Sequence, residues 1–190
     1  MIEFPIQIDD AIVLRPFADA DAAAMFDLIR RNRAHLDPWL RWSGRVQALE
    51  DTRQLIQRFA DKQAVGDGFH AGLWVSGALV GGVVVHFINR ESRKSEIGYW
   101  LGADYVGRGL VTRAARAVIE VLFTREAMHR IEIQAVIDNA PSRAVAERLG
   151  FKLEGVKRES EWVTSAFRDH AFYALLEQDW RSGEVSAAPS

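Results

Sequence analysis

The apolar positions in the first third of the chain follow first a strand pattern and then a helical one. Residues 12–16 alternate as a half-buried strand does, whereas 19–33 and 49–65 carry apolar residues at helical spacing. Asp19 or Asp21 is placed to cap the first helix, and the run Gly66-Asp67-Gly68 ends the second. The start of the chain therefore predicts one strand followed by two amphipathic helices.

From residue 69 the pattern changes to runs of β-branched and aromatic residues, which are typical of strands. Ser76-Gly77 separates the first two runs and indicates a hairpin turn. We predict strands at 69–76, 79–88, 95–101, 131–137, 151–161 and 168–176, and helices at 110–125 and 141–149. The order βααβββαβαββ predicts an α/β fold with a mixed sheet. Residues 1–181 are expected to form one domain, and the small, polar residues 182–190 a flexible tail.

Charge and composition remove several classes of protein. The 190 residues include 24 Lys and Arg against 26 Asp and Glu, which leaves a formal charge of −2. A general nucleic-acid binder needs a basic excess to neutralise phosphates, so no nucleic-acid partner is expected. The sequence contains neither a signal-peptide pattern nor an apolar run near the roughly 20 residues of a membrane helix. We therefore expect a cytoplasmic protein without a membrane partner.

Cysteine is absent from the sequence, which excludes disulfides, thiolate metal sites and a cysteine nucleophile. The five histidines have no metal-ligand spacing, so no metal is expected. His86 interrupts an apolar strand and is interpreted as a hydrogen-bonded core or edge residue.

The most informative segment is Gly107-Arg108-Gly109, which lies between a predicted strand and a predicted helix. The unpaired N–H groups and positive dipole end of a helix start favour an anion such as a diphosphate. Arg108 and Arg113 can supply positive charge, although two glycines before a helix are equally well explained as a structural turn. Thr112 stands where a dinucleotide-binding fingerprint needs its third glycine, and the P-loop motif is absent.

A second segment, Asn139-Ala-Pro-Ser142, begins the helix that ends at Leu149-Gly150-Phe151. Asn139 and Ser142 can each be read as a helix cap. Together with Glu96-Ile-Gly-Tyr-Trp-Leu101 and the glycine turn, this segment resembles the GNAT N-acetyltransferase superfamily. Within it, the chain resembles the RimJ/RimL-like branch, which acetylates protein N-termini, over roughly residues 12–180.

The resemblance implies a fold and a set of cosubstrate contacts. The fold is a GNAT-type mixed, mostly antiparallel sheet with splayed strands and flanking helices. The cosubstrate is acetyl-CoA, with its diphosphate on the backbone of Gly107, Arg108, Gly109, Leu110, Val111 and Thr112. The strand edge at Tyr99, Trp100 and Leu101 pairs with the pantetheine amides, and Asn139 hydrogen-bonds the pantetheine arm. Ser142 lies near the sulfur and protonates the leaving thiolate.

The reaction needs a neutral amine, and a carboxylate within reach can remove its proton. The resemblance favours Glu161 as this base, although the same residue can be a solvated strand charge beside Glu159. Glu96 is the second choice, with an ion pair to Arg93 or Lys94 as its alternative interpretation. Trp39 and Trp42 either line the acceptor groove or anchor a loop on the core.

The resemblance indicates direct acetyl transfer to a primary amine in a ternary complex, most simply the α-amine of a protein or peptide. The alternatives are a small-molecule acceptor such as a polyamine or an aminoglycoside, a CoA-binding sensor without catalysis, and a different α/β nucleotide-binding protein. A homodimer is implied by the resemblance alone.

Overall fold

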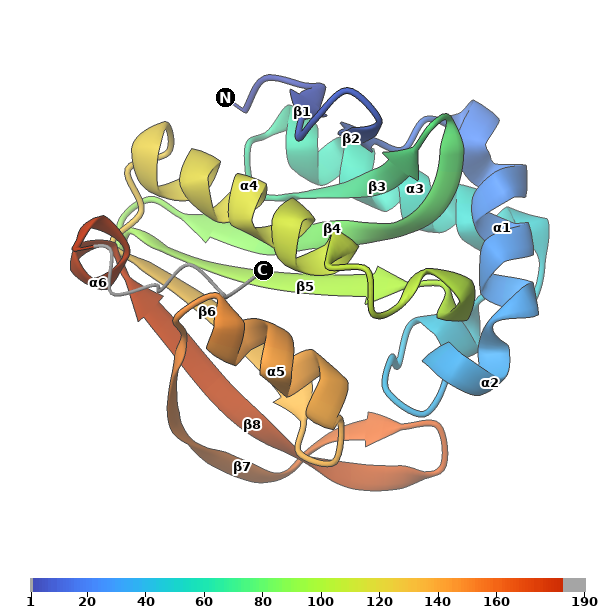
Figure 1. The fold of residues 1–190 in the computed structure, drawn as a ribbon. Coiled ribbons are helices and arrows are strands. Elements are labelled where there is room, and N and C mark those ends of the chain that lie inside the picture. The colour runs from blue at the N-terminus through green and yellow to red at the C-terminus, as the bar shows by residue number, and fades with distance from the viewer. Residues whose placement is uncertain (1, 183–190) are drawn as a thin grey trace.

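This computed structural model describes residues 2–182 of the chain. Its centre is an eight-stranded sheet (Figure 1). The strand order is β1-β2-β3-β4-β5-β6-β8-β7, and every neighbouring pair is antiparallel except β5 and β6. The predicted mixed sheet is confirmed. Its strands are β1 (Ile6–Gln7), β2 (Ile12–Pro16), β3 (Phe69–Val75), β4 (Ala78–Asn89), β5 (Lys94–Leu101), β6 (Arg130–Val136), β7 (Lys152–Val163) and β8 (Ala166–Leu176).

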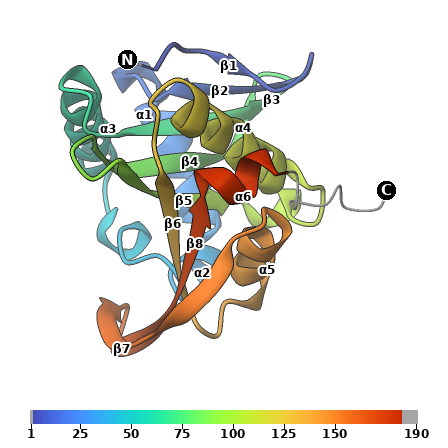
Figure 2. The same cartoon turned by 90° about the vertical axis from the view of Figure 1, so that its left-hand side faces the viewer.

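Six α-helices accompany the sheet within residues 2–182, and two pairs of them cover its opposite faces. Figure 2 shows α3 and α4 on the two sides of the strands. The helices are α1 (Ala22–Arg31), α2 (Arg33–Leu36), α3 (Leu49–Ala64), α4 (Leu110–Thr124), α5 (Ala140–Arg148) and α6 (Glu177–Arg181). None of these helices is long and apolar enough to cross a membrane. The expected tail at 182–190 lies outside the described residues, apart from Ser182, and stays a prediction.

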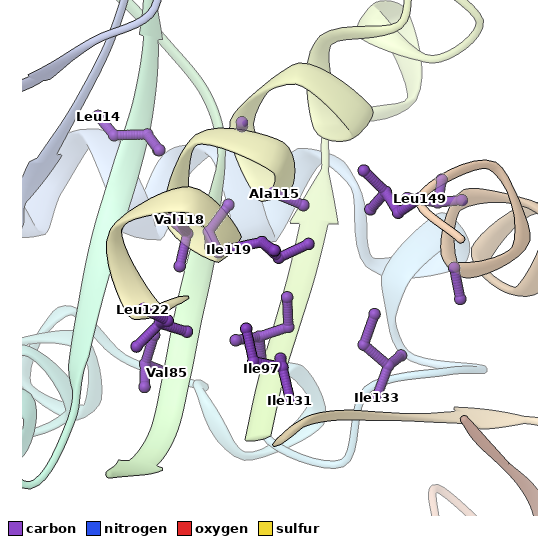
Figure 3. Packing of buried hydrophobic residues seen from close by; sticks show 14 of the residues in the cluster. Leu14, Val85, Ile97, Ala115, Val118, Ile119, Leu122, Ile131, Ile133 and Leu149 are labelled. Carbon is purple, nitrogen blue, oxygen red and sulfur yellow. The ribbon is translucent and has the colours of Figure 1, made fainter. Parts of the chain in front are cut away.

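The sheet separates two hydrophobic clusters. The larger lies under α4 and α5, where Val118, Ile119 and Leu122 meet Val85 and Ile97 of the sheet (Figure 3). The smaller lies on the other face, where α1 and α3 enclose Trp100. Since side chains alternate along a strand, β5 contributes Ile97, Tyr99 and Leu101 to the first face and Trp100 to the second.

The predicted helix at 19–33 is wrong in its extent. A short 3₁₀ turn (Asp19–Asp21) precedes α1, and Asn32 separates α1 from α2. The carboxylate of Asp21 does not cap α1, because it accepts hydrogen bonds from the Ala18 N–H at 2.9 Å and from both terminal nitrogens of Arg15. The short elements β1, α2 and α6 were not predicted, because a few residues carry too little periodicity to identify them.

The predicted hairpin at Ser76-Gly77 is confirmed. Both residues have positive φ angles, 48° and 81°, which is the backbone of a tight two-residue turn that follows the twist of the sheet. The predicted end of α5 is confirmed as well, since Leu149 is the C-cap residue of the helix and Gly150 follows it with φ of 84°.

Candidate active site

A gap opens in the sheet between β5 and β6. The two strands pair in parallel only over Lys94, Ser95 and Glu96, opposite residues 130–132, and no pair follows. Beyond Glu96 the ribbons diverge (Figure 1). The edge of β5 from Ile97 to Leu101 therefore keeps its outward backbone groups without a strand partner on the β6 side, although β4 pairs with its other edge.

A cavity of about 970 Å³ passes through this gap and reaches both faces of the sheet. This volume is large enough for an extended cosubstrate arm together with a second small group. On the α4 and α5 face the cavity is lined by Tyr99, Leu101, Gly107, Gly109, Leu110, Val111, Thr112, Asn139, Ser142 and Arg148. We call this part the cosubstrate half.

The other part of the cavity lies on the face covered by α1 and α3, and we call it the acceptor half. It is lined by His35, Trp39, Arg41, Trp42, Arg58, Phe59, Lys62, His70, His86, Glu96, Trp100, Gln134, Glu161 and His170. The structure thus brings residues as far apart in sequence as His35 and His170 to one opening.

The glycine turn forms an open cradle at the start of α4. Gly107 and Gly109 have φ angles of 76° and 69°, which favour glycine, and a Cβ atom on either would meet nothing within 4 Å. Gly109 is the N-cap of α4 and contributes no side-chain cap. Within residues 2–182 the backbone amides of Gly107 to Thr112 have no side-chain acceptor, so they can bind an anion together with the helix dipole.

The two arginines near the turn face away from the cradle. The guanidinium of Arg108 donates to the Asp104 carbonyl at 2.8 Å and does not line the cavity. Arg113 forms an ion pair with Asp9. Arg108 can therefore contribute to a diphosphate site through its backbone amide. The side chains of Arg108 and Arg113, which were expected to supply positive charge there, bind Asp104 and Asp9 instead.

Hydrogen bonds join the start of α5 to β5. The Tyr99 hydroxyl donates to the Ser142 carbonyl at 2.8 Å, and the Ser142 amide donates to the Asn139 side-chain oxygen at 3.2 Å. Burial raises the pKa of Tyr99 to about 12, so the phenol keeps its proton and remains a donor. Asn139 is thus a helix cap. Both residues line the cavity, and within residues 2–182 neither the Asn139 side-chain nitrogen nor the Ser142 hydroxyl has a hydrogen-bond partner.

Trp100 faces the acceptor half instead of the cosubstrate half. Its indole N–H donates to Nε2 of His70 at 3.0 Å, and Trp42 packs edge-on against the Trp100 ring at 5.4 Å. Burial lowers the pKa of His70 to about 3, which keeps that ring neutral and able to accept. Trp39 and Trp42 both line the cavity, so these tryptophans form an apolar wall of the acceptor half.

Two carboxylates face the acceptor half. Glu96 accepts a hydrogen bond from the Gln134 side chain at 2.8 Å, while Arg93 and Lys94 pair instead with Glu177 and Glu132. The Glu161 side chain is 46% exposed, lines the cavity and lies 4.0 Å from Nε2 of His170. Glu159, its neighbour on β7, does not line the cavity. Of the two interpretations of Glu161, its position favours the one in which it meets a ligand.

The polar lining residues that were not predicted as site residues include His86, Gln134 and His170. His86 is the unpaired residue of a bulge in β4, and its ring has no hydrogen-bond partner within residues 2–182, contrary to its interpretation as a bonded core or edge residue. Enclosure by the surrounding protein lowers the pKa of His86. The alternation of side chains along a strand indicates which residues share a face of the sheet. It does not indicate which face meets a cavity, because that depends on the order of the strands.

The Acetyltransferase (GNAT) domain matches residues 11–152 of this chain. The chain belongs to the GNAT acetyltransferases. Its mixed sheet, its divergent strands and its glycine turn before α4 are the features that the resemblance implied.

Curated relatives match almost the whole chain. YdaF of Bacillus subtilis (strain 168) is 32% identical over 178 residues, covering 93% of this chain and 97% of YdaF. The ribosomal-protein-serine acetyltransferase of Escherichia coli (strain K12) is 29% identical over 171 residues, covering 90% and 96%. A solved structure of RimL, a ribosomal L7/L12 α-N-protein acetyltransferase in complex with coenzyme A, gives a TM-score of 0.87 at 25% identity, covering 91% and 98%.

MccE, a microcin C7 self-immunity acetyltransferase solved with acetyl-CoA and AMP, gives a TM-score of 0.84 at 26% identity, covering 89% of this chain and 94% of MccE. This GNAT protein is therefore an acetyltransferase that uses acetyl-CoA as cosubstrate and an amine as acceptor. Family membership removes the alternative of an unrelated α/β nucleotide-binding protein. Within residues 2–182, no three His, Asp or Glu side chains are grouped as metal ligands.

Proposed function

We propose that this GNAT protein transfers the acetyl group of acetyl-CoA to the N-terminal α-amine of a protein or peptide, by direct attack within a ternary complex. The observation that carries the proposal is the cavity, which passes through the gap and joins the diphosphate cradle to two carboxylates on the opposite face. The named acceptors of the serine acetyltransferase of E. coli and of RimL support a protein acceptor.

In the cosubstrate half, the backbone amides of Gly107 to Thr112 hold the diphosphate. The unpaired edge of β5 between Ile97 and Leu101 offers backbone groups to the pantetheine amides, and the Asn139 amide nitrogen donates to the same arm. The Ser142 hydroxyl supplies a proton to the leaving sulfur. Residues 1–181 form the transferase domain in this proposal.

In the acceptor half, Glu161 removes a proton from the incoming ammonium, directly or through a water. An α-amine with a pKa near 7.8 is roughly 10–15% neutral at pH 7, against about 1 in 2,500 for a lysine. The difference of about 2.6 pKa units is roughly 3.5 kcal/mol. A half-exposed carboxylate without a metal is therefore sufficient for an α-amine, whereas a lysine side chain needs a stronger base.

The charges of the acceptor half distinguish a peptide from a polycation. Three basic side chains line it, Arg41, Arg58 and Lys62, against the two carboxylates Glu96 and Glu161. Arg41 and Arg58 have no carboxylate within 4 Å among residues 2–182. A site for a polyamine or an aminoglycoside needs an acidic excess to match several positive charges. This balance favours an acceptor with one reactive amine.

The acceptor class is tested by incubating the protein with labelled acetyl-CoA and two panels of amines, followed by mass spectrometry. One panel contains peptides with free N-termini and the same peptides blocked at the α-amine but carrying lysine. The other contains polyamines and aminoglycosides. We expect label on the free α-amines. Label on the small molecules alone would contradict the peptide acceptor.

Catalysis is separated from mere CoA sensing by the substitution Glu161→Gln. This variant should retain its dissociation constant for acetyl-CoA, measured by calorimetry, and lose about 100-fold in kcat, in the range typical of a general base. Glu159→Gln, on the same strand but outside the cavity, is the matched control and should retain wild-type turnover. Unchanged turnover in Glu161→Gln would remove the base assignment. Tight CoA binding without transfer to any amine would favour the sensor.

We also propose that two copies associate through β7, which is one of the two edge strands of the sheet. Large apolar side chains are exposed on this strand and on β8 beside it: Leu153, Val156, Trp162 and Phe167. A second copy can cover both this patch and the unpaired strand edge. Light scattering after gel filtration should give twice the mass of 21.4 kDa, and a monomer at all concentrations would contradict the dimer.

Acetylation of newly made proteins would place the enzyme in the cytoplasm.

A further inference from the structure

His170 on β8 is a buried histidine to which the mechanism above gives no role. Its side chain is 7% exposed and lines the acceptor half of the cavity. Ala171 and Tyr173 of the same strand belong to the cluster under α4 and α5, so strand alternation directs His170 to the opposite face. Nε2 of its ring lies 4.0 Å from the Glu161 carboxylate.

The contacts of His170 favour one tautomer of its neutral ring. Nδ1 lies 3.2 Å from the Arg168 carbonyl oxygen and 2.9 Å from the Ser160 hydroxyl oxygen. A carbonyl oxygen can only accept, so the tautomer with the proton on Nδ1 is the one that gives the Arg168 carbonyl a donor, and the Ser160 hydroxyl can accept from the same N–H or donate elsewhere. The lone pair is therefore on Nε2, the nitrogen that faces Glu161.

This tautomer excludes a nucleophilic serine, although Ser160, His170 and Glu161 are neighbours. The serine hydroxyl lies beside Nδ1, which is already protonated and cannot remove another proton. Ser160 does not line the cavity, whereas His170 and Glu161 do. The two cavity-lining groups are both proton acceptors, so the ring and the carboxylate can hydrogen-bond to each other only after one of them has gained a proton.

We propose that Glu161 and His170 form a proton-accepting pair, in which Nε2 of His170 takes over the proton that Glu161 removes from the acceptor ammonium. The inference rests on the proposed function. An ammonium group loses two protons as its nitrogen becomes the amide. The new C–N bond forms as the C–S bond breaks, one proton ends on the sulfur of CoA, and the other is the one that the pair receives and releases to solvent.

The chemical advantage of the pair follows from ordinary basicities. Imidazoles titrate near pH 6.5 and carboxylates near 4.3, so an imidazole holds a proton more tightly at neutral pH than a carboxylate does. A protonated ring beside Glu161 is in turn stabilised by the negative charge. The carboxylate is then free to accept from the next ammonium.

Several charged groups surround the pair. Lys157 of β7 is the register partner of His170. Glu96 of β5 faces the same cavity, and His86 of β4 lies within electrostatic reach of both Glu96 and Glu161. Arg168, on β8 itself, is paired with Asp138 at 3.9 Å.

The decisive variant is His170→Asn, because asparagine keeps an N–H near Nδ1 for the Arg168 carbonyl and removes Nε2. Its kcat should fall at least tenfold, with KM for acetyl-CoA unchanged. The fall of kcat on acidification should shift to lower pH, because the remaining base is the weaker one. His129→Asn, an exposed histidine outside the cavity, should match the wild type. A lower kcat with the wild-type pH profile would reduce His170 to a structural role and overturn the inference.

The double variant Glu161→Gln/His170→Asn tests whether both groups handle the same proton. If they do, the double variant is no slower than Glu161→Gln alone, whereas independent roles give losses that multiply. NMR titration of the histidines tests the pair without turnover: Glu161→Gln should move the midpoint of the His170 titration to lower pH. An unmoved midpoint overturns the pair. A moved midpoint in a protein that acetylates no amine contradicts the proposed function instead.

Discussion

Substitution of Gly109 tests whether the cradle before α4 binds by close approach of its backbone. Gly109 has φ of 69°, and an added Cβ atom meets nothing within 4 Å in the free protein. Alanine therefore causes no clash, and its cost is the left-handed backbone alone, about 1–2 kcal/mol. For a chain of this size that lowers Tm by roughly 2–8 °C, at about 2–4 °C for each kcal/mol.

The effect on binding should exceed the effect on stability. The methyl group of Gly109→Ala points into open space that a diphosphate needs, so the Kd for acetyl-CoA should rise at least tenfold, about 1.4 kcal/mol. Gly109→Asn adds a larger side chain but tolerates the left-handed backbone better. It should therefore retain more stability than the alanine variant and still bind weakly.

Gly77 provides the matched control. It has φ of 81°, an added Cβ atom there also meets nothing within 4 Å, and it lies in the β3–β4 turn outside the cavity. Gly77→Ala should lower Tm by a similar amount and leave Kd unchanged. Calorimetric titration with acetyl-CoA and thermal melts measure both quantities. Wild-type affinity in Gly109→Ala, or equal weakening in Gly77→Ala, would refute the reasoning.

Three further predictions follow from single contacts. Tyr99→Phe leaves the Ser142 carbonyl without its donor, so the free energy of unfolding measured in urea should fall by about 1–3 kcal/mol and kcat should fall with it. His70, with its pKa lowered to about 3, is neutral when folded and charged when unfolded below pH 6.5, so stability should decline as pH falls from 6.5 toward 3. His70→Gln should remove that part of the decline in melts recorded across this range. Arg58→Glu makes the acceptor half acidic, so KM for a polyamine should fall by roughly fivefold, from about 1 kcal/mol of attraction; an unchanged KM would show that Arg58 does not meet the acceptor.

The fold predictions that succeeded depend on a few neighbouring residues. The hairpin at Ser76-Gly77, the end of α3 before Gly66 and the end of α5 at Leu149 are each fixed by a few adjacent residues, whose backbone preferences do not depend on the rest of the chain. The helix predicted at 19–33 failed because Asp21 bonds to Arg15 and Ala18 instead of the helix amides. That choice is made by a partner on another element.

The candidate site divides in the same way. Gly107 and Gly109 were identified from sequence because a left-handed turn before a helix requires residues of this type. Tertiary structure decided that Arg108 turns away from the cradle, that Trp100 faces the acceptor half and that His86 bulges out of β4. Glu161 and His170 meet across the β7–β8 hairpin, but both reach the gap only because β8 lies beside β6, in a strand order that differs from the order along the chain. Periodicity indicates on which face of its own helix or strand a residue lies. Which faces come into contact depends on pairings between distant segments, and no local sequence pattern encodes those pairings.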